Sequence, residues 1–135
     1  MRQIYQLTQV LERVIAAVVG LKGKGQSQEA IQITNQALTE HLKLDIDALL
    51  DMDADQMIEK LEEHAGMNHE NLENAADLFY ELGTIVAGEE NKDVESAQLY
   101  ERALKIYRYI ESEGTIYSID RNHKIQEIEQ RLSES

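Results

Sequence analysis

Five carboxylates in one short segment have the spacing of a calcium-binding loop. They are Asp51, Asp53, Asp55, Glu59 and Glu62, which match positions 1, 3, 5, 9 and 12 of a twelve-residue loop. Calcium takes about six to eight oxygen ligands, and this spacing could supply them. Gln56, however, stands where such a loop needs glycine for its sharp turn, and the apolar residues that follow continue a helical stripe. We therefore expect no metal site here, but a helix capped by Asp53 with solvated carboxylates.

Four histidines, His41, His64, His69 and His123, are the other candidates for metal binding. No two of them are four residues apart, the spacing with which a helix presents a zinc-binding pair. We therefore expect solvated histidines. Paired carboxylates are plentiful but lie in polar stretches near expected turns, and the chain contains neither a phosphate-binding loop nor a nucleophile motif. The sequence thus predicts no catalytic residues and no cofactor.

The composition permits one folded domain over residues 1–135, with 42% apolar residues, no proline and no cysteine. The absence of cysteine excludes disulfides, thiolate metal sites and cysteine nucleophiles. The first six residues lack the basic-then-apolar order of a signal peptide. The longest apolar run, 14–19, is far shorter than the ~20 residues that cross a bilayer. We expect a cytoplasmic protein without a membrane partner.

The net charge of −13 is unevenly distributed along the chain. Residues 1–43 carry a net charge of +2, residues 44–98 carry −14 and residues 99–135 carry −1. The acidic middle repels phosphate backbones, so we expect no binding of nucleic acid. The same segment suits a cationic ligand, although solvated helix faces have a similar composition.

Apolar residues recur with helical spacing, and no stretch alternates with the period of a strand, so the predicted fold class is all-α. The predicted helices cover residues 2–19, 27–42, 53–65, 69–87, 93–113 and 118–132. Residues 45–50 are compatible with a short helical turn under the core. Ser27 and Asp53 are the predicted N-caps, and Gly66 is predicted to end the third helix.

Residues 76–107 resemble a tetratricopeptide repeat (TPR), a helix–turn–helix unit of ~34 residues. The Leu82–Gly83 pair matches the first helix of that repeat. Ser96, Tyr100 and Ala103 match the small, aromatic and small positions of its second helix. A fainter copy covers residues 11–42, and the layout is also similar to short, uncharacterised bacterial proteins with repeat-like helices. The resemblance implies antiparallel helical hairpins, in a right-handed superhelix or a compact bundle of about six helices.

In the TPR family the first helix of each repeat lines a groove that receives a peptide. Transferred to this chain, the resemblance implies partner binding by Asp77, Tyr80, Thr84 and Ala87. The Lys and Asn of the family's carboxylate clamp are not found on that face. We therefore expect a noncatalytic interaction or scaffold module that binds a protein or peptide. A homodimer through the wide apolar face of residues 2–19 is a further expectation. The alternative is a small sensor that binds a divalent cation or a cationic ligand at the acidic middle segment.

Overall fold

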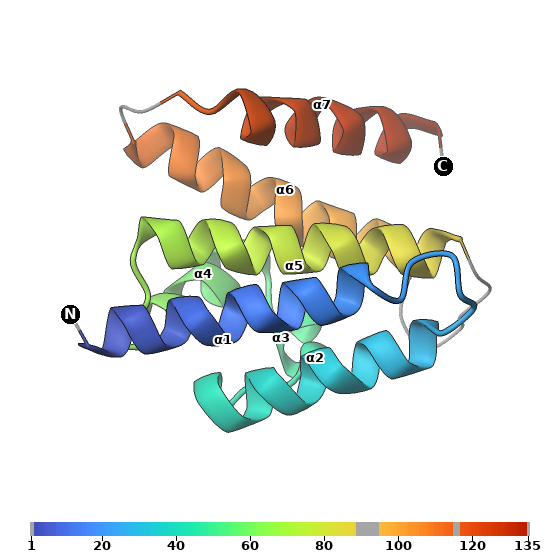
Figure 1. The fold of residues 1–135 in the computed structure, drawn as a ribbon. Coiled ribbons are helices and arrows are strands. Elements are labelled where there is room, and N and C mark those ends of the chain that lie inside the picture. The colour runs from blue at the N-terminus through green and yellow to red at the C-terminus, as the bar shows by residue number, and fades with distance from the viewer. Residues whose placement is uncertain (1, 89–94, 115–116, 135) are drawn as a thin grey trace.

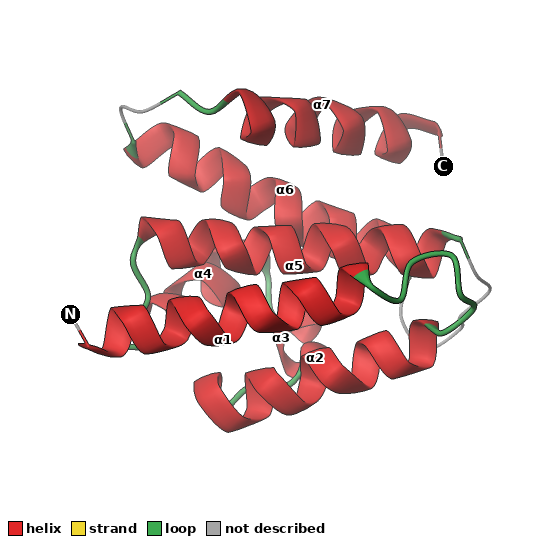
Figure 2. Ribbon diagram, viewed as in Figure 1, coloured by secondary structure: helices red, strands yellow, loops and turns green. Residues whose placement is uncertain are grey.

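The structure, a computed structural model, describes residues 2–88, 95–114 and 117–134. These residues form helices and loops, and none of them forms a strand (Figure 2). The helices are α1 (Arg2–Val19), α2 (Ser27–Leu42), α3 (Ile46–Asp51), α4 (Ala54–Glu62), α5 (His69–Ala87), α6 (Ser96–Glu113) and α7 (Ile119–Glu134). The predicted all-α fold class is confirmed. The described part has one helix more than the six expected, because residues 46–51 form a helix of their own.

Two helical hairpins build most of the molecule (Figure 1). The first consists of α1 and α2, joined by a turn in which Gly23 and Gly25 have positive φ angles of 71° and 67°. Only glycine adopts this conformation without strain, so the glycine-rich segment forms the predicted turn. The second hairpin consists of α5 and α6. Helix α1 packs along α5, α7 packs on α6, and the short helices α3 and α4 contact α6 from the other side.

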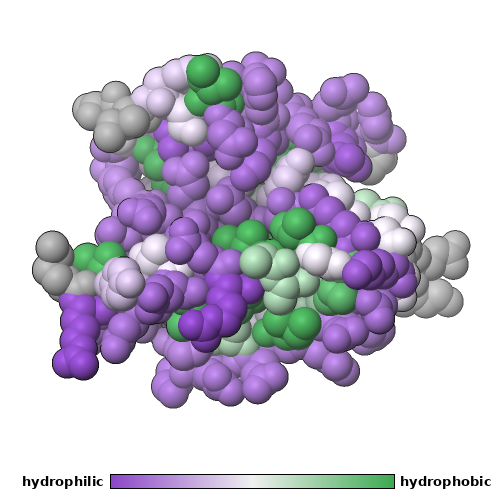
Figure 3. Space-filling view, in the orientation of Figure 1, coloured by the Kyte–Doolittle hydropathy of each residue, from purple (hydrophilic) through white to green (hydrophobic). Residues whose placement is uncertain are grey.

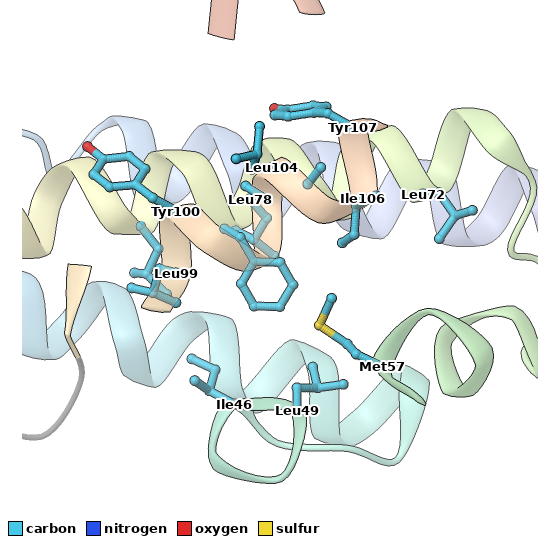
Figure 4. Close-up of a cluster of buried hydrophobic side chains, with 14 of the residues drawn as sticks. Ile46, Leu49, Met57, Leu72, Leu78, Leu99, Tyr100, Leu104, Ile106 and Tyr107 are labelled. Atoms are coloured by element: carbon cyan, nitrogen blue, oxygen red, sulfur yellow. The ribbon is translucent and has the colours of Figure 1, made fainter. Parts of the chain in front are cut away.

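The core includes buried apolar residues from every helix. In the close-up of Figure 4, Ile46 and Leu49 of α3 and Met57 of α4 point toward the side chains of α5 and α6. These three residues are at most 1% exposed. Each fully buried side chain of this size stabilises the fold by about 1.5–3 kcal/mol. The two short helices are therefore held by packing, since helices of this length are not stable alone.

Helix α5 has the bounds predicted from the sequence. Asn68 begins it as N-cap, where its side chain accepts a hydrogen bond from the backbone N–H of Asn71 at 2.9 Å. Gly83 faces α6, and a Cβ atom added there would lie 3.2 Å from the Tyr100 ring. The two helices therefore approach each other closely at this position, which explains why a small residue is needed here.

Two predicted helix ends are wrong. Ser27 is the first helical residue of α2 and not its N-cap; the N-cap is Gln26, whose carbonyl accepts from Ala30 N–H at 3.1 Å. Gly66 does not end the third helix, because α4 already ends at Glu62. Gly66 instead lies against the backbone of Gln3, where an added Cβ atom would be only 2.5 Å from the carbonyl oxygen.

Asn71 fastens this turn to the start of α1, and its side chain is fully buried. Its amide nitrogen donates to the carbonyl oxygens of Ile4 at 3.1 Å and of Gly66 at 2.8 Å. Its amide oxygen accepts from the Thr8 hydroxyl at 2.8 Å. A buried amide with both ends satisfied orders its surroundings. It therefore fixes the N-terminal half of α1 beside α5 and the turn after α4.

The last two helices differ slightly from their predicted bounds, because α6 begins at Ser96 after the extended Glu95, and α7 covers Ile119–Glu134 instead of residues 118–132. Helix α6 ends at Glu113, just before Gly114 as predicted. Its expected start near residue 93 lies outside the described residues. Ser118 precedes α7, and its hydroxyl accepts from the backbone N–H of Arg121 at 3.1 Å. This contact has the geometry of a helix cap.

Candidate functional site

The acidic segment around Asp53 begins a helix. The Asp53 carboxylate accepts from the Gln56 N–H at 2.9 Å, and the Gln56 side chain accepts from the Asp53 N–H at 3.4 Å. This reciprocal capping confirms Asp53 as the N-cap of α4. From Ala54 the backbone is helical, so the carboxylates of Asp55 and Glu59 are exposed along a helix. Among the described residues, no three His, Asp or Glu side chains gather in a way that could hold a metal ion.

The predicted partner-binding residues of α5 already make contacts within the chain. The Asp77 carboxylate accepts from the Tyr107 hydroxyl at 2.5 Å and from the Lys124 ammonium at 3.1 Å. The Thr84 hydroxyl lies 3.0 Å from the Tyr100 hydroxyl.

Tyr80 donates to the Glu127 carboxylate at 2.8 Å, whereas Ala87 is exposed near the end of α5. Asp77, Tyr80 and Thr84 are thus brought together with α6 and α7, and Ala87 is not.

Charged side chains of α7 hold it against this face of α5. Arg121 is only 5% exposed, and its guanidinium pairs with Glu73 of α5 and Glu111 of α6, each at 2.8 Å. Burial of Lys124 acts to lower its pKa, but the carboxylates of Asp77 and Asp120 outweigh it, so the pKa lies above its usual value. Both cations therefore stay charged in the contact. A peptide that approached the predicted residues of α5 would have to displace α7.

Two tyrosines in this contact resist ionisation. Burial raises the pKa of Tyr107, and the neighbouring Asp77 carboxylate raises it further. Burial and the Glu127 carboxylate raise the pKa of Tyr80. Both hydroxyls are therefore held in the neutral, hydrogen-bond-donating form.

A second surface lies between α1, the C-terminal end of α2 and the C-terminal end of α4. It contains three adjoining cavities of about 480, 460 and 200 Å³. His41 lines all three cavities. The largest cavity shares Val10 and Arg13 with the smallest and shares His64 with the one of 460 Å³, so the three form one continuous groove. We call it the α1–α2–α4 groove, and its lining on α1 runs from Gln3 to Val14.

The groove combines apolar side chains with polar ones. Its apolar members are Leu7, Val10, Val14, Ile33, Ala37, Leu42 and Leu44. Several of them, such as Val10, Ile33 and Ala37, are only half-buried. On the face shown in Figure 3, apolar side chains also gather beyond the groove, over the C-terminal half of α1 and the adjoining part of α2, with hydrophilic residues around them. An apolar patch with a polar rim is the usual surface of a binding site for protein.

The charges of the groove differ from those of the chain as a whole. Its lining includes three of the 13 Lys and Arg side chains, namely Arg13, Lys43 and Lys60. It includes only two of the 26 Asp and Glu side chains, Glu40 and Glu63. With three cationic and two anionic side chains, the lining of the groove carries a net charge of +1 on a strongly anionic molecule.

Sequence reasoning did not find this groove. His41 and His64 were expected as separate solvated histidines, and the structure brings both to one groove from two helix ends. The signal that pointed toward it was the net charge of +2 over residues 1–43 against −14 over residues 44–98. That contrast shows which part of the chain is least acidic, but not which helix ends meet.

Comparisons with protein-family models, with curated proteins and with solved structures give no match for this chain. None of the described helices is long and apolar enough to span a membrane.

Proposed function

We propose that this chain is a noncatalytic interaction module that binds a segment of another protein along the α1–α2–α4 groove. The observation that carries the proposal is the groove itself, which combines half-buried apolar side chains such as Val10 and Ala37 with a polar rim. Within the described part of the chain, no helix lies over it. The groove is preformed, so a ligand does not have to displace part of the protein.

The dimensions of the groove suit a chain segment. Its lining runs along α1 from Gln3 to Val14, which at the rise of a helix is about 16 Å. This length fits about five residues of extended peptide or about eleven residues of helix. The groove is open on one side, as binding of a continuous chain requires, whereas a small substrate is usually enclosed.

The α5 face is less suited to the same function in this conformation. Binding there requires that α7 leave, which exposes Ile125 and Ile128. Each of these side chains costs about 1.5–3 kcal/mol to expose. The ion pairs of Arg121 would also be lost. The α1–α2–α4 groove binds without this cost, which favours it as the interaction surface.

Site-directed photocrosslinking tests the proposal. A photoreactive residue replaces Gln6, which is exposed and lines the groove, and in a matched control it replaces Gln126, which is exposed on α7. We expect crosslinks to one discrete protein segment from the first position and not from the second. That segment, made as a peptide, is expected to bind the purified chain and to lose binding with Val10→Asp.

Two results would contradict the proposal. The first is crosslinking at equal levels from both positions, which indicates no preferred surface. The second is a crosslinked product that consists of two copies of this chain, together with light scattering at twice 15.4 kDa. In that case the face of α1 is a homodimer contact, as the wide apolar face of residues 2–19 suggested.

A further inference from the structure

We infer that the α1–α2–α4 groove selects an acidic segment, in which Asp or Glu side chains accompany apolar ones. This inference rests on the proposed function, because it names the chemistry of the partner for the same groove. It is carried by the charge of the lining, in which Arg13, Lys43 and Lys60 outnumber the two carboxylates, whereas carboxylates outnumber cations two to one in the chain as a whole. Complementary charge across an interface selects the partner and steers its approach.

The cations of the groove are accessible to a ligand. Lys60 lies 3.6 Å from Glu63, with the two side chains 50% and 66% exposed, so this pair is open to solvent and weak. The Lys43 ammonium donates to the carbonyl oxygen of Glu40 at 3.2 Å and is likewise exposed. Neither cation is neutralised by a buried carboxylate. A carboxylate of a partner can therefore approach both of them.

The polar rim also supplies hydrogen-bond donors. The backbone N–H of Gly66 donates to Nδ1 of His64 at 2.9 Å. Because Nδ1 accepts this bond, the neutral ring carries its proton on Nε2, which is then a donor. Gln3, Gln6 and Gln9 add side-chain amides along α1. Amides and ring N–H groups next to cations match a ligand that is rich in carboxylate and carbonyl oxygens.

Two other ligand classes match less well. A basic segment would meet three cations and only two carboxylates in the groove, whereas the rest of the chain offers it many more carboxylates. A nucleic acid needs a longer row of cations than Arg13, Lys43 and Lys60 provide, and residues 44–98 with a net charge of −14 repel its phosphates. The apolar side chains of the groove, such as Val10 and Ala37, have no role in binding a phosphate backbone. An acidic protein segment can contact both the apolar side chains of the groove and its polar rim.

The histidine rings are natural reporters for a binding experiment on the full chain. His41 and His64 line the groove, and His69 and His123 lie outside it. Three synthetic peptides of about 12 residues, matched to the length of the groove, share the same leucine positions and carry Glu, Gln or Lys elsewhere. Each is titrated while the ring signals of all four histidines are followed by NMR.

Charge-reversal variants locate the effect. Arg13→Glu and Lys60→Glu change exposed side chains of the groove, and Lys105→Glu makes the same charge change on an exposed position of α6. We expect the Glu peptide to shift the His41 and His64 signals and not those of His69 and His123. Each groove variant is expected to weaken this binding about threefold to tenfold, and Lys105→Glu to leave it within about twofold. Circular dichroism checks that each variant is folded.

Several outcomes overturn the inference. If the Gln peptide shifts the same two rings with the same affinity, the groove binds protein segments without selecting acidic ones, and the proposed function stands. If a thymidine oligonucleotide binds there as tightly as the Glu peptide, the groove recognises negative charge in general. If no peptide shifts the His41 and His64 rings, the inference is wrong. The crosslinking from Gln6 then decides separately whether the proposed function fails with it.

Discussion

Replacement of Gly66 by alanine is expected to disrupt the contact between α1 and the turn after α4. The new Cβ atom would lie 2.5 Å from the carbonyl oxygen of Gln3 and 2.9 Å from its carbonyl carbon. These distances are roughly 0.6–1 Å short of an optimal contact of ~3.5 Å, and both atoms belong to the backbone. The start of α1 must therefore move away from the turn, since no flexible side chain can yield instead.

The cost has two parts. Overpacking of a tight contact costs about 1–3 kcal/mol. Movement of the turn also strains the hydrogen bonds of Asn71 to Ile4 and Gly66, and each buried polar group left unpaired costs about 1–3 kcal/mol. We expect a loss of about 2–4 kcal/mol in the free energy of unfolding. For a chain of this length, a loss of about 3 kcal/mol lowers Tm by roughly 10 °C.

Urea denaturation followed by circular dichroism measures this loss, with Gly88→Ala as the matched control. Gly88 has a right-handed φ of −81°, and its nearest atoms to an added Cβ are 3.6 and 3.8 Å away. Alanine at that position is expected to be neutral or to stabilise by up to about 1 kcal/mol, because it restricts the unfolded chain. An unchanged midpoint for Gly66→Ala, or equal losses for both variants, would refute the packing argument.

Three further predictions concern single side chains. Asp77→Ala leaves the buried Tyr107 hydroxyl without its acceptor and is expected to destabilise the chain by about 1–3 kcal/mol. Because Tyr107→Phe removes that hydroxyl, the double variant should lose less free energy of unfolding than the two single variants lose together. Strictly additive losses in urea denaturation would contradict this coupling. The raised pKa of Tyr107 means that its hydroxyl stays protonated when the unfolded chain ionises, so the contribution of Tyr107 to stability should be constant below about pH 10 and fall as the pH rises further. In thermal melts the alkaline fall should be shallower for Tyr107→Phe, and an equal slope would count against this cause. Lys43 ends α2 with a positive φ of 62°, a conformation that strains any residue with a Cβ atom, so Lys43→Gly should stabilise the chain by about 1 kcal/mol. The same change removes a cation of the groove and should weaken binding of the Glu peptide. A loss of stability in urea denaturation would show that the backbone strain at Lys43 is absent.

The sequence predicted best the elements whose apolar residues alone determine their position. Helix α5 is an example, because the spacing of Leu72, Phe79 and Leu82 and the glycine after Ala87 mark both its buried face and its end. Asp53 was also predicted correctly as a cap, since an N-cap acts over only three residues. These are local signals, which depend only on residues that are close together in the sequence.

The features that were missed depend on contacts between distant segments. The glycine pattern suggested that Gly66 ends a helix, but its role is to admit the backbone of Gln3, more than sixty residues away. Helical spacing shows which side of a helix is buried and not which helix covers it. The resemblance to a repeat therefore placed Asp77 and Tyr80 on one face of a helix, but it did not show that Lys124 and Glu127 of α7 lie on that face. For the same reason it did not bring His41 and His64 together.

The Asn71 contacts also have a consequence for how the chain folds during synthesis. They join Thr8 and Ile4 of α1 to a single residue of α5 that lies 63 and 67 positions further along the chain, so α1 cannot complete its packing until α5 has left the ribosome. Until then the apolar side of α1 has only α2 to cover it. Contacts of such long sequence separation form slowly, and an apolar helix that waits for its partner is a site for chaperones or for aggregation. The α1–α2–α4 groove is accordingly among the last features to form, and a partner that requires it binds only chains that have finished folding.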